Sequence, residues 1–222
     1  MDGRIIRQAR QLNLPRVGKI KIGSKNERGL PQSQDFFSAT GAYAKLFEAE
    51  YGGKPSIIQV VFPSDEAEKV CNEMYEYRDN GGKLCAYGNG QDFYVWNGQE
   101  YILFTRDENP HIMQQVSKRY PSKKGWQITL TLTFIIPRVR GVAGVWSLTT
   151  KGAASTIPAI CDTFDFVKSQ KGFIKGLIFD LCVSFTTSQK PGQNSRYPVV
   201  NLVLNESEDN LKSIKGLLEQ KK

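Results

Sequence analysis

The stretch that decides the fold runs from Trp126 to Thr156 and reads WQITLTLTFIIPRVRGVAGVWSLTTKGAAST. From Ile128 to Ile136 every second residue is apolar, with threonines between them except for Ile135, and this period of two predicts a β-strand. Pro137 ends the strand, the glycines at 141 and 144 predict a turn, and a second extended segment is expected over residues 145–148. The stretch therefore predicts two strands joined by a basic, glycine-containing turn.

A helix is expected directly after this stretch. Ser155 or Thr156 is a suitable N-cap, and apolar residues then recur at helical spacing as far as Val167, before Gly172 closes the helix. The same reasoning predicts further strands over residues 17–22, 35–40, 55–62, 75–78, 83–87, 92–96, 101–104, 177–185 and 199–204, and further helical segments over 41–51, 108–120 and 207–220.

These elements predict an α+β fold: a mixed, mainly antiparallel sheet with a few flanking helices and an amphipathic C-terminal helix at 207–220. Residues 1–16 read as a basic N-terminal arm, and residues 17–222 as a single domain. The strand at 55–62 is apolar on both faces, so we expect it inside a sheet that is covered on both sides.

Charge is distributed unevenly along the 222 residues, whose net charge is +8. Residues 34–108 carry a net charge of −7, whereas residues 109–161 carry +7 and contain no Asp or Glu. Such an alternation can seat two parts of one protein against each other, or it can attract an anionic partner. The sequence leaves both interpretations open.

The basic block supplies the candidate binding residues. Arg138 and Arg140 lie beside glycines that permit close backbone approach, an arrangement suited to phosphates, and Trp146 could stack on a base. Against this, Trp146 could belong to the core while the arginines are solvated or pair with the acidic section, and we favour the core for Trp146. The full set of partner- or nucleic-acid-binding candidates is Arg138, Arg140, Trp146, Lys151, Lys118, Arg119, Lys123 and Lys124.

Enzyme and metal motifs are scarce in the chain. It has no P-loop, no nucleophile-elbow motif and no zinc-protease motif, and His111 is its one histidine. The four cysteines are far apart with no CxxC pair, so we expect reduced thiols, no metal and no other cofactor. No segment resembles a signal peptide or a membrane span, so we expect a cytosolic protein. The scarcity of enzyme motifs favours a protein that is not an enzyme.

Several segments, in this order, resemble the recombination directionality factors that partner large serine integrases of actinophages and related mobile elements. The segments that carry the resemblance are Gly18–Gly23 with Pro31 and Asp35-Phe36, the hairpin Tyr77–Gly90, Leu130–Pro137, Gly144–Gly152 with Ser155-Thr156, and Tyr197–Leu204. Some relatives carry a cysteine-rich, possibly zinc-binding segment after the glycine turn. Residues 89–127 contain no cysteine here, so that metal is not carried over.

The resemblance implies a regulator that acts in the cytoplasm of a bacterial host. Such factors bind the DNA-bound integrase, at its coiled-coil arm, and redirect it from integration toward excision between attL and attR. DNA contact is then secondary and non-specific, and the oligomeric state is left open. The alternative is a phage-encoded single-stranded nucleic-acid-binding protein for replication or repair, with Trp96, Trp126 or Trp146 as stacking platforms. A metal-independent ribonuclease ranks third, because no acid–base pair is visible.

Overall fold

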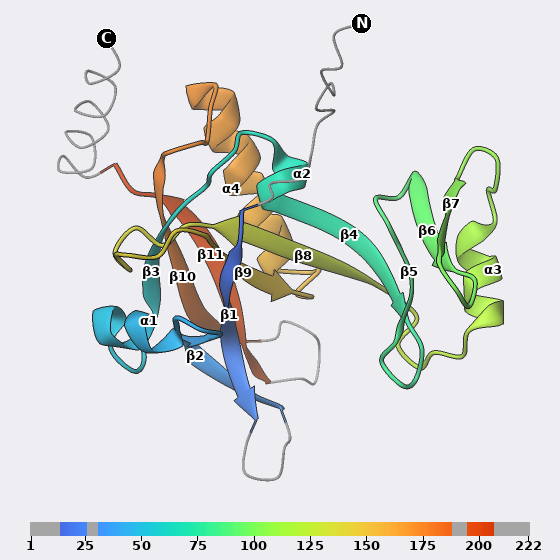
Figure 1. The fold of residues 1–222 in the computed structure, drawn as a ribbon, viewed down its shortest axis with the longest axis horizontal. Helices are drawn as coiled ribbons and strands as arrows, with labels where there is room; N and C mark the ends of the chain where they lie inside the picture. The colour runs from blue at the N-terminus through green and yellow to red at the C-terminus, as the bar shows by residue number, and fades with distance from the viewer. Residues whose placement is uncertain (1–13, 26–30, 188–194, 207–222) are drawn as a thin grey trace, which may run out of the picture.

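The computed structural model describes residues 14–25, 31–187 and 195–206 (Figure 1). Two sheets contain all the strands in these ranges. The larger sheet has eight strands, in the order β2 (Pro31–Thr40), β1 (Arg16–Lys25), β9 (Val145–Thr150), β8 (Trp126–Phe134), β4 (Cys71–Arg78), β5 (Leu84–Gly88), β6 (Asp92–Trp96) and β7 (Tyr101–Thr105). The smaller has three, in the order β11 (Arg196–Leu204), β10 (Ile178–Thr187) and β3 (Ile57–Val61).

Strand pairing is antiparallel throughout except between β1 and β9, which run parallel with Gly18 opposite Trp146. Four helices complete the described residues: α1 (Ala44–Tyr51), α2 (Ala67–Val70), α3 (Ile112–Arg119) and α4 (Thr156–Lys171). The predicted α+β class and the mixed, mainly antiparallel sheet are thus confirmed. The predicted C-terminal helix at 207–220 and most of the predicted arm at 1–16 lie outside the described residues.

The main hydrophobic core lies where the two sheets and α4 meet. Phe62, which follows β3, packs edge-on against Phe164 of α4 and Phe179 of β10, with both pairs of ring centroids 5.4 Å apart. Trp146 of β9 joins this core and lies 6.0 Å from the ring of Phe47 in α1. These side chains are almost completely buried, so the alternating apolar residues of β8 and β10 fix which sheet faces turn inward.

A second, smaller core lies at the far end of the large sheet. It joins side chains of β4, β5 and β6 to Ile112 and Val116 of α3, and Trp126 at the start of β8 packs against it. Figure 1 shows β4 and β8 as long strands that run from the main body to this unit. We call β5, β6, β7 and α3 together the distal unit.

One local expectation is wrong, and a second, the N-cap of α4, is right for the position of Ser155 but not for its side-chain bond. β3 is an edge strand rather than an inner one, and Ile57 is 53% exposed, because only three strands form the smaller sheet. Ser155 precedes α4 but makes no side-chain capping bond. The neighbouring Thr156 is buried and instead accepts the backbone N–H of Val200 at its Oγ1 (3.1 Å), which ties the start of α4 to β11.

Candidate interaction surface

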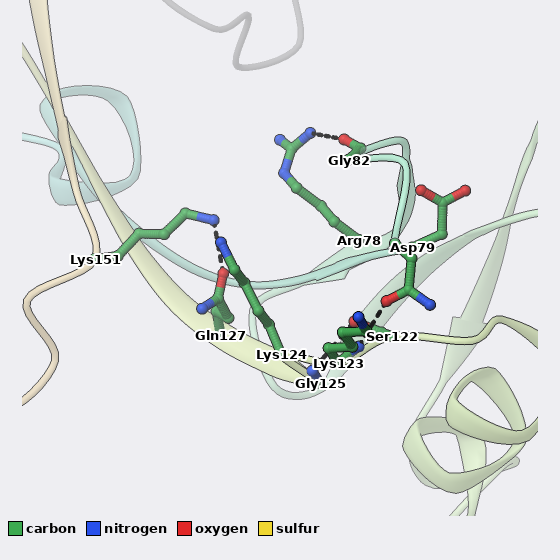
Figure 2. A pocket seen from close by; sticks show the side chains of 10 residues that line it. Arg78, Asp79, Gly82, Ser122, Lys123, Lys124, Gly125, Gln127 and Lys151 are labelled. Atoms are coloured by element: carbon green, nitrogen blue, oxygen red, sulfur yellow. Dashed lines mark hydrogen bonds between the residues drawn. The ribbon is translucent and has the colours of Figure 1, made fainter. Parts of the chain in front are cut away.

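A basic pocket lies between the β4–β5 turn and the segment that leads from α3 into β8 (Figure 2). Its volume is about 210 Å³. Four cationic side chains and one carboxylate line it: Arg78, Lys123, Lys124, Lys151 and Asp79. The rest of the wall consists of Asn80, Gly82, Ser122, Gly125 and Gln127. We refer to these four cations and their surroundings as the basic pocket.

Backbone hydrogen bonds hold the two walls of the pocket together. Asn80 donates its backbone N–H to the carbonyl of Pro121 (3.1 Å), and its Oδ1 accepts the N–H of Lys123 (2.9 Å). On the turn side, Asp79 accepts the N–H of Lys83 at Oδ1 (2.9 Å), while Gly82 adopts a φ of 83° that other residues avoid. The turn chemistry that predicted a hairpin therefore also fixes one wall of the pocket.

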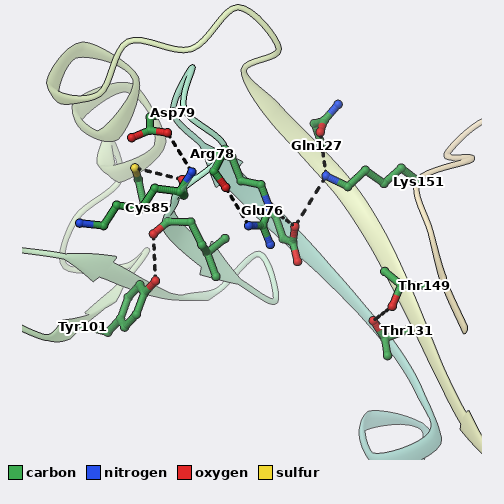
Figure 3. A network of polar contacts seen from close by, with 12 residues as sticks. Glu76, Arg78, Asp79, Cys85, Tyr101, Gln127, Thr131, Thr149 and Lys151 are labelled. Carbon is green, nitrogen blue, oxygen red and sulfur yellow. Dashed lines mark hydrogen bonds and ion pairs between the residues drawn. The ribbon is translucent and has the colours of Figure 1, made fainter. Parts of the chain in front are cut away.

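A single carboxylate organises the cations on the strand side of the pocket, as Figure 3 shows. Glu76 Oε2 lies 3.1 Å from Arg78 Nε and 3.7 Å from Lys151 Nζ. Lys151 also donates to Gln127 Oε1 (2.9 Å), and Arg78 donates from Nη1 to the carbonyl of Gly82 (3.1 Å). Glu76 thus positions two cations but balances only one of their charges.

The remaining two cations of the pocket are available to a partner. Within the described residues, the ammonium groups of Lys123 and Lys124 make no ion pair. Figure 2 shows Lys124 extending toward Lys151 across the pocket. Positive groups that converge in this way suit an oxyanion such as a carboxylate or a phosphate. The structure therefore brings three of the predicted candidates together and adds Arg78, which lies in the acidic section of the sequence.

The arginines of the basic turn lie elsewhere. β8 has nine residues, so its two ends are roughly 26 Å apart at the usual rise of a strand, with the basic pocket at one end and Arg138 beyond the other. Arg138 pairs with Glu50 of α1 (3.0 Å) and lies 4.8 Å from the ring centre of Tyr51. Both arginines lie in the turn that follows β8, where the N–H of Val139 donates to the carbonyl of Ile136 (3.1 Å); Arg140 is exposed and Val139 is buried.

Lys118 and Arg119 form a third group at the end of α3. Both are exposed. Arg119 donates from Nη2 to the carbonyl of Asn97 in the β6–β7 hairpin (3.0 Å), and its guanidinium lies 5.4 Å from the ring centre of Tyr120. The contacts of Arg119, Arg138 and Lys151 all reach into residues 34–108, so part of the charge alternation seats the basic section against the acidic one.

Trp146 must be removed from the candidate surface residues. Its side chain is 1% exposed and stacks within the main core, so it cannot offer a ring face to a base or a partner. Trp126 is also committed, because it packs against the second core and donates from Nε1 to the carbonyl of Met113 (3.1 Å). Trp96 remains nearer the surface, with the Lys83 ammonium 4.8 Å above its ring.

The cysteines are free thiols in the structure, and Cys71 and Cys161 lie in contact across β4 and α4. The hydrogen bond that the Cys71 thiol donates to Cys161, together with burial, raises the pKa of Cys71 above its usual range. Within the described residues there is no group of three metal-ligating side chains. The helices of the described part are all too short or too polar to cross a membrane.

Comparison with known families gave a match that spans nearly all of the described architecture. A family model described as "Gp3-like: Recombination directionality factor-like" matches residues 17–205, which run from β1 to the end of β11. The chain belongs to this recombination directionality factor-like family. Comparison with curated proteins and with solved structures gave no match. The matched residues include both hydrophobic cores and the basic pocket of this chain.

Proposed function

We propose that this protein binds a DNA-bound large serine integrase, at its coiled-coil arm, and switches the integrase from integration to excision between attL and attR. The observation that carries the proposal is the family match over residues 17–205, which includes every described strand except the first residue of β1. The protein acts as a regulator through protein contact rather than as an enzyme. Any contact with DNA is secondary and independent of sequence.

We further propose that the basic pocket receives an acidic side chain or a phosphate of the DNA-bound complex. Lys123 and Lys124 make no ion pair within the described residues, whereas Arg138 already has Glu50 as its partner. Charged pairs across an interface chiefly raise the association rate and fix the docking register. The pocket is well suited to this task because its walls are held in place before a partner arrives.

The central experiment is recombination in vitro with the purified cognate integrase. Adding the protein should stimulate recombination of attL with attR and suppress recombination of attP with attB. If excision is not stimulated at saturating protein, although the integrase is active on attP and attB, the proposed function is wrong. Direct binding to integrase without DNA, measured by interferometry, then separates a failure to bind from a failure to switch.

A pair of charge reversals tests the role of the pocket. The double variant Lys123→Glu, Lys124→Glu should lose most of the stimulation, since each exposed charge contact contributes about 0.2–1 kcal/mol and reversal turns attraction into repulsion. The matched control is Arg138→Glu, Arg140→Glu, which changes the charge equally at the other end of β8. Equal losses in the two variants would show that net charge, rather than the pocket, determines the interaction.

The alternative function, single-stranded nucleic-acid binding, has one observation in its favour. The rings of Tyr87, Tyr94, Trp96 and Tyr101 lie next to one another on the open face of the distal unit, with adjacent centroids 5.1–5.2 Å apart. Bases stack on such surfaces, and phosphate contacts make the binding salt-dependent. Quenching of tryptophan fluorescence by an oligonucleotide, reversed by salt, would support this function; no quenching at low salt would exclude it.

A further inference from the structure

The two sheets have four edge strands, and three of them are covered. On β3, the Gln59 N–H donates to the Tyr51 hydroxyl (3.2 Å), and Val61 exchanges hydrogen bonds with Ile135 (2.8 and 2.9 Å). On β2, the Phe37 N–H donates to the carbonyl of Pro55 (2.7 Å). Each of these edges is therefore closed to a further strand by contacts within the chain.

The edge at β11 is blocked in the same manner. Pro198 has no N–H to offer, and the N–H of Val200, two residues later on the same side, donates to Thr156 Oγ1 (3.1 Å). The fourth edge strand is β7, with the sequence YILFT. It contains no proline, glycine or charged residue, which are the features that usually protect an exposed edge.

Hydrogen bonds at both ends of β7 show which of its backbone groups point outward. Asn97 N–H donates to the carbonyl of Glu100 (3.0 Å), and Arg106 N–H donates to the carbonyl of Gln91 (2.7 Å). Glu100 and Arg106 therefore form hydrogen-bonded pairs with the β6 side. Residues along an antiparallel strand alternate between hydrogen-bonded and non-hydrogen-bonded pairs, so Ile102 and Phe104 also bond to β6. The N–H and C=O groups of residues 101, 103 and 105 then face away from the sheet.

These outward groups are largely unused. The Thr105 carbonyl accepts both the backbone N–H (2.9 Å) and the side-chain Nδ2 (3.4 Å) of Asn109, whereas within the described part of the chain no partner bonds the backbone of Tyr101 or Leu103 on this side. The side chains are exposed on both faces of the strand: Ile102 is 40% exposed and Leu103 is 50% exposed. Ile102 lies on the face of the sheet that packs against α3 at β5 and β6. Its side chain is nevertheless exposed, so α3 does not cover this part of β7.

We propose that β7 pairs with β7 of a second copy of this chain, antiparallel about a two-fold axis through Leu103. In this register Leu103 faces Leu103 of the other copy, and Tyr101 faces Thr105. Both pairs join residues whose N–H and C=O groups point outward. The two Leu103 residues bond to each other, and the Thr105 N–H of each copy donates to the Tyr101 carbonyl of the other, whereas the Thr105 carbonyl keeps its two donors from Asn109. Tyrosine opposite threonine is a favourable cross-strand pair.

Charges at the ends of the strand favour a second copy over an unrelated strand. Glu100 precedes β7 and Arg106 follows it, and both are exposed. The register centred on Leu103 places Glu100 of each copy opposite Arg106 of the other. The segment 100–106 is thus self-complementary: the charges attract at both ends and no like charges face each other between them.

The test is sedimentation velocity of the full chain from low micromolar to submillimolar concentration. The weight-average mass should rise from 25.0 kDa toward twice that value. The variant Leu103→Lys places two ammonium groups face to face at the axis and should weaken the dimer about tenfold or more. Its control is Leu46→Lys, since Leu46 is an exposed leucine on α1 (46%) that lies away from this edge and should leave the dimer unchanged.

A charge swap tests the register itself. Glu100→Arg and Arg106→Glu should each weaken the dimer several-fold, and the double variant should restore it, because the swapped charges again attract. The proposal is overturned by any of three results: the parent stays at the mass of one chain throughout, Leu103→Lys dimerises as well as Leu46→Lys, or the double swap is weaker than both single ones. None of these readouts involves integrase, so they are independent of the proposed function.

Discussion

Replacing Gly18 by alanine should destabilise the protein through a direct clash with Trp146. Gly18 lies in β1 opposite Trp146 of β9, and a Cβ atom at residue 18 would come within 2.4 Å of indole Cζ3 and 2.9 Å of the Thr40 carbonyl oxygen. The indole is 1% exposed and cannot move into solvent. Overpacking of this kind costs about 1–3 kcal/mol, and because strand, ring and carbonyl all confine the site, we expect the upper half of that range.

Urea unfolding followed by far-UV circular dichroism measures the change in the free energy of unfolding. In a separate thermal melt, the melting temperature should fall by about 2–4 °C for each kcal/mol lost by a chain of this size. Gly53→Ala is the control, because a Cβ there meets no atom within 4 Å. In the double variant Gly18→Ala, Trp146→Phe the smaller ring relieves the clash, so the two effects should be non-additive by about 0.5–3 kcal/mol. A Gly18→Ala protein as stable as Gly53→Ala, or strictly additive effects, would refute the reasoning.

Three further predictions concern stability. Two backbone N–H groups donate to Asp65 Oδ1 (both 2.7 Å) and lower the pKa of its carboxyl. The stability that these bonds give the folded state is present above pH 3.8 and is lost as the pH falls through the lowered pKa. Acid titration should therefore destabilise wild type more than Asp65→Asn. Thr156→Val leaves the Val200 N–H buried without an acceptor and should cost about 1–3 kcal/mol in urea unfolding, with a smaller value contradicting the bond. Arg138→Ala removes a half-exposed ion pair with Glu50 and the contact of the guanidinium with the Tyr51 ring, each worth up to about 1 kcal/mol at an exposed site. The total cost in the same assay should therefore stay below about 2 kcal/mol, and a larger loss would contradict this account.

Local patterns in the sequence were sufficient to predict most elements of the fold. The alternation in β8, the glycine turn before β5 and the apolar stripe of α4 each depend on neighbours a few residues apart. The position of β3 at an edge could not be predicted in this way. The place of β3 in the sheet depends on its pairing with β10, which lies more than a hundred residues later in the chain. An inner strand and an edge strand that other contacts cover have the same apolar pattern, so the pattern cannot distinguish them.

The candidate site was predicted only in part, for a geometric reason. A run of positive residues looks continuous in a sequence, but an intervening strand separates its two ends, so Lys124 and Arg138 lie at opposite ends of β8. Arg78 was missed because it lies in the acidic section and reaches the pocket only through the pairing of β4 with β8. The hairpin turn at 79–82 was the available signal, because its strands place Arg78 beside the neighbouring loop.

The parallel pairing of β1 with β9 has a consequence for synthesis of the chain. β1 ends at Lys25, yet the strand that it joins in parallel begins at Val145, so the ribosome must produce most of the protein before that neighbour exists. During this interval β1 can pair only with β2, and closure over so many residues is slow. Expression at low temperature, which slows aggregation of the unfinished sheet, should therefore raise the soluble yield more than stronger induction does.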